Sequence, residues 1–135
     1  MGSSLERLIY RSEATGVDPR SALEHILGPS IRNNARQKIT GALGFSNQTY
    51  VQLLEGSAPA LDMLLETLKS DRRHTGLTVL LRSQVVNRLV PAWSMARVDL
   101  ALPAPKVTRA LEADDGLALM NLMATLAHEG ITETR

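Results

Sequence analysis

Gln52 is a polar residue inside an otherwise apolar segment, Tyr50-Val51-Gln52-Leu53-Leu54. Strand alternation places Gln52 on the same face as Tyr50 and Leu54, which are residue types expected in a core. Burial of an amide without hydrogen-bond partners costs about 1–3 kcal/mol. Gln52 therefore either faces solvent or contacts a polar group inside the protein.

Two other segments contain polar side chains that can meet Gln52. Tyr10 lies in the alternating segment Leu8–Ser12, and Asn33 and Asn34 lie near the end of a helical segment. Taken singly, Tyr10 is typical of a core residue, and the asparagines are typical of a helix cap. If the strands of Tyr10 and Gln52 are neighbours and the helix packs on the same face, Tyr10, Gln52 and Asn34 converge. Buried polar groups persist when they hydrogen-bond each other or a ligand.

A flat heteroaromatic ligand with carbonyl and N–H groups on its edges would satisfy an asparagine amide and a glutamine amide together. Ile26 and Ile39 would then pack against its ring faces. The residue types alone predict a site for a polar-edged aromatic ligand and leave that ligand unidentified.

Other chemistries lack the residues that they need. The chain has no cysteine, and its histidines lie far apart without metal-ligand spacing, at His25, His74 and His128. There is no glycine-rich phosphate-binding motif; Gly41-Ala42-Leu43-Gly44 lies inside a strand pattern and indicates close packing. Glu55 has no paired acid and is interpreted as a turn carboxylate. Arg72-Arg73-His74 either contacts a phosphate or carbonyl or, by default, forms a solvated junction.

Composition fits a single soluble domain. The 135 residues are long enough for a substantial core, and 44% of them are hydrophobic. The net charge of +1 gives no bias towards nucleic acid or an acidic membrane surface. No apolar run is long enough to span a membrane, and the absence of cysteine suits the cytoplasm. We therefore expect a cytoplasmic protein that binds neither nucleic acid nor membrane.

The order of strands and helices in the chain determines whether these side chains can meet. Period-2 and period-3.6 patterns predict five strands, at 5–11, 39–46, 49–55, 77–81 and 93–100, and two helices, at 18–36 (broken at Gly28-Pro29) and 57–69. Asn47-Gln48 predicts a two-residue hairpin turn, and the strand 77–81, apolar at both parities, is expected inside the sheet. The order β-α-β-β-α-β with an added fifth strand predicts an α+β, ferredoxin-like fold with both helices on one sheet face.

A helical extension is expected after this unit. Pro103 and Pro105 separate residues 1–100, the ligand-binding domain, from residues 101–135. Apolar residues at helical spacing between 107 and 129 predict one or two helices, with a break at Asp114-Asp115-Gly116. Their apolar face must be covered by the open side of the sheet or by another subunit. The extension is thus a cap or an oligomerisation element, and we expect a homodimer or a higher oligomer.

Six segments together resemble the BLUF domain, the blue-light sensor that uses FAD. They occur in the family's order and spacing over about residues 5–98. The segments are Leu8–Ser12 (LIYRS), Ser30–Arg36 (SIRNNAR), Ile39–Leu43 (ITGAL), Val51–Gly56 (VQLLEG), Asp71–His74 (DRRH) and Pro91–Met95 (PAWSM). The ferredoxin-like fold of this family agrees with the strand order predicted from periodicity.

The resemblance implies a role for each matching residue. Tyr10 corresponds to the tyrosine that gives an electron and a proton to excited flavin, and Gln52 corresponds to the glutamine that switches between this tyrosine and flavin. Trp93 and Met95 correspond to the pair on the fifth strand that passes on the signal. The implied cofactor-binding residues are Ser12, Ile26, Asn33, Asn34, Ile39, Gln52, Asp71, Arg73 and His74.

The resemblance further implies a short photoreceptor without a fused output domain, and no enzymatic activity. It would bind FAD non-covalently and signal to itself or to an unidentified downstream protein. Some positions depart from the family pattern: Gly28-Pro29 interrupts the first helix, Gly44 replaces a bulkier residue, Asn47-Gln48-Thr49 lacks the usual hairpin glycine, and Tyr50 replaces a common phenylalanine. The alternatives are a light-insensitive ferredoxin-like regulatory module and a small hydrolase of the acylphosphatase type.

Overall fold

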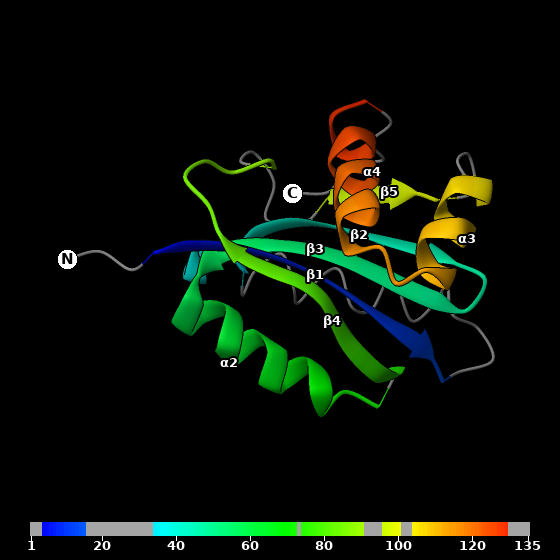
Figure 1. Cartoon of the computed structure of the whole chain (residues 1–135). Coiled ribbons are helices and arrows are strands. Elements are labelled where there is room, and N and C mark those ends of the chain that lie inside the picture. Colours follow the sequence, from blue (N-terminus) through cyan, green and yellow to red (C-terminus); the bar gives the residue numbers. More distant parts are fainter. Residues whose placement is uncertain (1–3, 16–33, 73, 91–95, 101–103, 130–135) are drawn as a thin grey trace.

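The computed structural model describes residues 4–15, 34–72, 74–90, 96–100 and 104–129. It contains one five-stranded sheet in the order β4-β1-β3-β2-β5 (Figure 1). The strands are β1 (Leu5–Ala14), β2 (Thr40–Ser46), β3 (Thr49–Ser57), β4 (His74–Gln84) and β5 (Ala96–Asp99). The helix predicted at 18–36 lies outside the described residues except for its last turn, Asn34–Gln37, which is helical.

The predicted α+β, ferredoxin-like arrangement is confirmed. Strands β1 and β3 are antiparallel neighbours at the centre, β2 and β3 form a hairpin, and β5 adds to the edge of the sheet parallel to β2. Both turn residues of the hairpin, Asn47 (φ 46°) and Gln48 (φ 72°), have positive φ, which matches the twist of the flanking strands. The predicted turn is thus formed without a glycine. The Gln48 carbonyl also accepts the Ala14 N–H at 2.7 Å, so the turn is tied to β1.

Gly41 allows the close approach of β2 and β3. A Cβ at this position would overlap the backbone carbonyl oxygen of Leu53. A Cβ at Gly44 would lie only 2.8 Å from the Leu100 side chain. The prediction that these glycines mark close packing is confirmed.

The expectation that residues 77–81 lie inside the sheet is wrong, because β4 forms one edge. A register shift explains the misleading apolar pattern. Ile9 pairs with Leu81 but Tyr10 pairs with Val79, so Leu80 is an extra residue in the ladder. Leu80 and Leu81 both pack against the hydrophobic cluster beneath the C-terminal helices, and the apolar residues are therefore covered by a helix layer rather than by another strand.

Helix α2 (Ala58–Lys69) covers one face of the sheet (Figure 1). Its N-cap is Ser57, whose Oγ accepts the Ala60 N–H at 3.2 Å, and Pro59 lies in the first turn. The apolar stripe of α2 packs against the even-numbered residues of β1 and β3, and the cluster includes Leu8, Tyr10, Ile39, Leu43, Tyr50, Leu54, Leu61, Leu65 and Leu68. This layer contains Tyr10 and Ile39, two of the residues predicted to lie at the ligand site.

Helices α3 (Ala104–Glu112) and α4 (Gly116–Glu129) cover the opposite face (Figure 1). The predicted break between them is confirmed: Asp114 has a φ of 49°, and the Asp115 carboxylate caps α4 by accepting the Ala118 N–H at 3.0 Å. Their apolar residues pack on the odd-numbered side chains of the central strands, in a cluster that includes Ile9, Val51, Leu53, Val98, Leu119, Met120 and Met123. The extension therefore caps the open side of the sheet.

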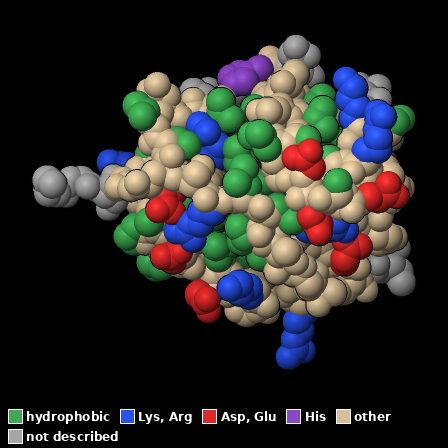
Figure 2. Space-filling model, in the orientation of Figure 1, with side chains coloured by type: hydrophobic (Ala, Val, Ile, Leu, Met, Phe, Trp, Pro, Cys, Tyr) green, Lys and Arg blue, Asp and Glu red, His purple; other side chains and the backbone are tan. Residues whose placement is uncertain are grey.

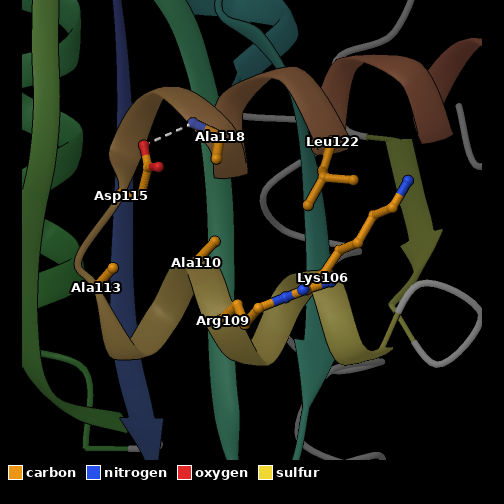
Figure 3. Close-up of a pocket in the computed structure, with 7 residues that line it drawn as sticks. All are labelled: Lys106, Arg109, Ala110, Ala113, Asp115, Ala118 and Leu122. Atoms are coloured by element: carbon orange, nitrogen blue, oxygen red, sulfur yellow. Dashed lines mark hydrogen bonds between the residues drawn. The ribbon is translucent and has the colours of Figure 1, made fainter.

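An open groove of about 560 Å³ lies between α3 and α4 (Figure 3). Lys106 and Arg109 lie on its α3 side, and Ala110, Ala118 and Leu122 supply its apolar lining. On the face shown in Figure 2, acidic and basic side chains are interspersed around a central band of hydrophobic side chains. Among the described residues, no helix is both long and apolar enough to cross a membrane.

Candidate functional site

The register of β1 and β3 places Tyr10 directly opposite Gln52. The Tyr10 hydroxyl donates a hydrogen bond to Oε1 of Gln52, and both residues are 2% exposed. Of the two interpretations of Gln52, exposure to solvent is therefore excluded, and contact with a polar group inside the protein is the one that the structure shows. The bond lies between the sheet and α2, in the layer where apolar residues otherwise pack.

The direction of this hydrogen bond follows from the chemistry of both groups. A carbonyl oxygen only accepts, so the phenol must carry the proton that is shared with Oε1. Burial raises the pKa of the Tyr10 phenol well above its usual range, and the Asp71 and Tyr50 side chains raise it further by electrostatic interaction. Tyr10 is therefore a neutral proton donor, and Gln52 accepts its proton through Oε1 while Nε2 is the donor end of the same amide.

A second set of buried hydrogen bonds begins at Ser12, two residues after Tyr10 on the same face of β1. Ser12 is fully buried, and its Oγ lies 2.7 Å from Nδ1 of His74. Nε2 of His74 lies 2.7 Å from the carbonyl oxygen of Leu68 at the end of α2. Because that carbonyl only accepts, Nε2 carries a proton, and in the neutral imidazole Nδ1 accepts the Ser12 hydroxyl proton. His74 is thus buried and hydrogen-bonded, and the default interpretation of a solvated junction is wrong for this residue.

Aromatic rings surround these polar groups. The ring centroid of His74 lies 6.5 Å from that of Tyr10 and 6.3 Å from that of Tyr50, and the Tyr50 contact is edge-on. Phe45 stacks at a tilt against Tyr50 with a centroid distance of 5.2 Å. The rings exclude water from the Tyr10–Gln52 bond and strengthen its electrostatics.

Asn34 and Ile39 lie on the same side of the sheet. Asn34 is 1% exposed, and its backbone carbonyl accepts the Ile39 N–H at 2.8 Å. Both residues line a cavity of about 200 Å³ whose opposite wall is α2, including Ala60 and Leu64. The amide and the apolar side chain thus border the same hollow.

Five predicted site residues lie outside the described part of the chain: Ile26, Asn33, Arg73, Trp93 and Met95. Asp71 is half-buried and close enough to Tyr10 to influence its pKa. The structure therefore gathers Tyr10, Gln52, Ser12, His74 and Asp71 on the α2 side of the sheet.

Sequence reasoning missed Glu55. It was expected as a turn carboxylate, but its side chain is completely buried on the opposite face of β3 from Gln52. It forms an ion pair with Arg7 at 2.7 Å. Its position in a strand flanked by buried residues was the available signal, because a carboxylate at such a position needs a partner.

The donor set fits a flat heteroaromatic cofactor. A phenol and amides border a layer walled by aromatic and branched apolar side chains, and these are the residue types that the edges and faces of such a ring system need. Among the described residues, no group of three or more His, Asp or Glu side chains is arranged to hold a metal ion.

Comparison with known proteins gives consistent matches. The family model described as "Sensors of blue-light using FAD" (BLUF) matches residues 5–96. The photoactivated adenylate cyclase subunit beta of Euglena gracilis is 35% identical over 94 residues, which are 69% of this chain. The blue light- and temperature-regulated antirepressor BluF of Escherichia coli K12 is 31% identical over 98 residues, or 73% of this chain. The matches cover only 11% of the cyclase subunit and 24% of the antirepressor.

A solved structure has the same fold. The dark-state structure of BlrB, described as a BLUF protein, superimposes with a TM-score of 0.81 and 29% sequence identity. The superposition covers 93% of this chain and 98% of that one. The likeness therefore includes the C-terminal helices as well as the sheet.

Proposed function

Because the chain belongs to the BLUF family of blue-light sensors, we propose that it is a photoreceptor whose switch is the hydrogen bond between Tyr10 and Gln52. The family binds flavin, and we propose FAD, held non-covalently, as the flavin of this chain. The observation that carries the proposal is the buried hydrogen bond between the Tyr10 phenol and the Gln52 amide, which lies within an otherwise apolar layer.

We assign the cofactor-binding roles as follows. Asn34 would bind a carbonyl edge of the flavin, Ile39 would pack against the ring, and Ser12 and His74 would fix the polar end of the layer. Asp71 would contribute to the same end, and Gln52 would offer its Nε2 donor. Ile26, Asn33 and Arg73 complete the proposed set through their positions in the family pattern.

When bound, FAD supplies blue-light absorption and, once excited, an acceptor for one electron and one proton. Tyr10 supplies both, because its phenol stays protonated until the electron leaves and is acidic afterwards. The proton leaves Oη along the existing bond to Oε1 of Gln52. Nε2 of Gln52 would be the group that passes a different proton on to the flavin while Oε1 gains one, so that charge and atoms would balance across the glutamine.

With Tyr10 restored as a neutral phenol, Gln52 would remain in a rotated or tautomeric form. An amide has different donor and acceptor ends, so rotation or tautomerisation of Gln52 changes which neighbour each end contacts. A stronger hydrogen bond from Gln52 to bound flavin would lower the excitation energy of the flavin and would give a red shift. The change then biases the strand that carries Gln52, and Trp93 and Met95 are the proposed relay.

The output is proposed to be an action on a partner. The relatives named above are a cyclase subunit and an antirepressor, and the chain spans a tenth to a quarter of their lengths. We propose that this chain catalyses no reaction itself and signals, in the cytoplasm, through a second copy or a separate effector. Mass measurement in solution under dark and lit conditions tests the homodimer or higher oligomer.

Pigment identification and light response test the proposal together. The purified protein should be yellow, release FAD on denaturation, and show a reversible red shift of its absorption under blue light. A protein that stays colourless after refolding with FAD contradicts flavin binding. A yellow protein without a red shift indicates instead a light-insensitive regulatory module.

A further inference from the structure

Glu55 lies on β3, three residues after Gln52 and on the opposite sheet face. Its side chain is 0% exposed. Oε2 accepts hydrogen bonds from Nε of Arg7 and from the Leu89 N–H, both at 2.7 Å, and Oε1 accepts the Val90 N–H at 2.8 Å. A buried carboxylate with this many short, charge-assisted bonds holds its partners at fixed positions.

The partners of Glu55 fasten the segment that follows β4. Leu89 and Val90 are bound through their backbone N–H groups, and Arg7 also donates to the Asn87 carbonyl at 2.8 Å. Arg88 donates to the backbone carbonyl of Glu55 at 2.9 Å. The segment Asn87–Val90 is therefore attached to β1 and β3 together.

Further contacts connect this segment to β2 and α4. Arg88 donates to Oγ1 of Thr40 and to the Lys38 carbonyl, both at 2.8 Å. Nε2 of His128, near the end of α4, lies 2.6 Å from the Leu89 carbonyl. A displacement of β3 at Glu55 would thus reach both the start of β2 and the C-terminal cap.

We propose that Glu55 is a positioning residue that mechanically couples the strand carrying Gln52 to the segment Asn87–Val90 and, through His128, to α4. This inference rests on the proposed photoreceptor function. Gln52 and Glu55 share a short, centrally paired stretch of β3, so a shift of the backbone at one residue moves the other. The fastened segment leads directly into residues 91–95, which contain the sole tryptophan, Trp93.

Glu55→Gln tests the coupling, because the amide replaces one acceptor oxygen by a donor that faces other donors. The Tyr10–Gln52 bond lies on the other face, so the variant should bind flavin and keep the red shift at its wild-type size. The light-induced change in Trp93 fluorescence should fall at least about threefold. A threefold change corresponds to about 0.7 kcal/mol in the free-energy difference between the dark and lit states of the coupled segment. Glu66→Gln, an exposed carboxylate on α2, is the matched control and should leave both signals unchanged.

A second variant covers the case in which Glu55→Gln fails to fold. Arg88→Met removes the bonds from this segment to the Glu55 carbonyl and to Thr40 while leaving the buried carboxylate in place. It should reduce the Trp93 response in the same direction. If the folded variants keep the full light-induced change in Trp93 fluorescence, the coupling role is overturned. It is also overturned if the variants lose the red shift together with the Trp93 response. A wild type without any red shift overturns the proposed function, and this inference with it.

Discussion

At the scale of single residues, the fold keeps Tyr10 protonated and aimed at one atom. The phenol is buried, its pKa is raised chiefly by desolvation, and its proton is directed at Oε1 of Gln52. The sequence predicted that these two residues meet, because alternation along each strand placed both side chains on the face that points to the core. The pairing of His74 with Ser12 was not predictable, since it depends on where α2 ends.

The raised pKa of Tyr10 predicts a pH dependence of stability. In the unfolded chain a tyrosine ionises near its ordinary pKa of 10.0, whereas the folded protein keeps Tyr10 protonated well above that pH. The unfolded state then binds fewer protons, so the free energy of unfolding should fall with rising pH by up to about 1.4 kcal/mol per pH unit beyond pH 10. Tyr10→Phe should lack this component. Urea denaturation of both proteins across this range measures it, and parallel curves contradict the assignment.

The buried Ser12–His74 hydrogen bond predicts a stability effect. Ser12→Ala leaves Nδ1 of His74 without its hydroxyl partner in a dry layer, which should lower the free energy of unfolding by about 1–3 kcal/mol. Ser83→Ala, on the exposed part of β4, is the control and should stay within about 0.5 kcal/mol of wild type. Equal denaturation midpoints for the two variants would show that the bond contributes nothing.

At the scale of elements, the sequence predicted correctly the turns and helix ends that are determined by neighbouring residues. The Asn47-Gln48 turn, the start of the helix predicted at 57–69 and the break at Asp114-Asp115-Gly116 all depend on a few consecutive side chains. The place of β4 in the sheet was predicted wrongly, because strand order and the register shift at Leu80 depend on distant partners. Glu55 was missed for the same reason: its partners lie far along the chain.

The contact between β2 and β3 at Gly41 predicts a steric effect. Gly41→Ala would force a methyl group against the Leu53 carbonyl, so the two strands must separate, at a cost of about 3 kcal/mol. Gly76→Ala is the comparison, because nothing lies within 4 Å of its added Cβ but its φ is +66°. It should cost only about 1–2 kcal/mol, through backbone conformation alone. A Gly41→Ala variant as stable as Gly76→Ala would contradict the packing described.

At the scale of the whole molecule, the sheet separates two chemically different layers. The α2 layer holds the polar groups of the site, and the α3–α4 layer contains a large apolar cluster together with the buried Glu55–Arg7 pair. The sequence predicted an apolar cap but left open whether the sheet or another subunit covers it, because hydrophobicity does not specify a partner. With the proposed switch in the α2 layer, a signal to the C-terminal helices has to cross the sheet.

The most direct measurement is the light-minus-dark absorption spectrum of the wild type, Tyr10→Phe and Gln52→Leu at equal flavin content. The wild type should show a reversible red shift, because the proposed switch is a light-driven rearrangement of the bond between Tyr10 and Gln52. Both variants should retain bound flavin and lose the shift, since one lacks the donor hydroxyl and the other lacks the amide. A red shift of unchanged size in either variant would contradict the switch assigned to these two residues.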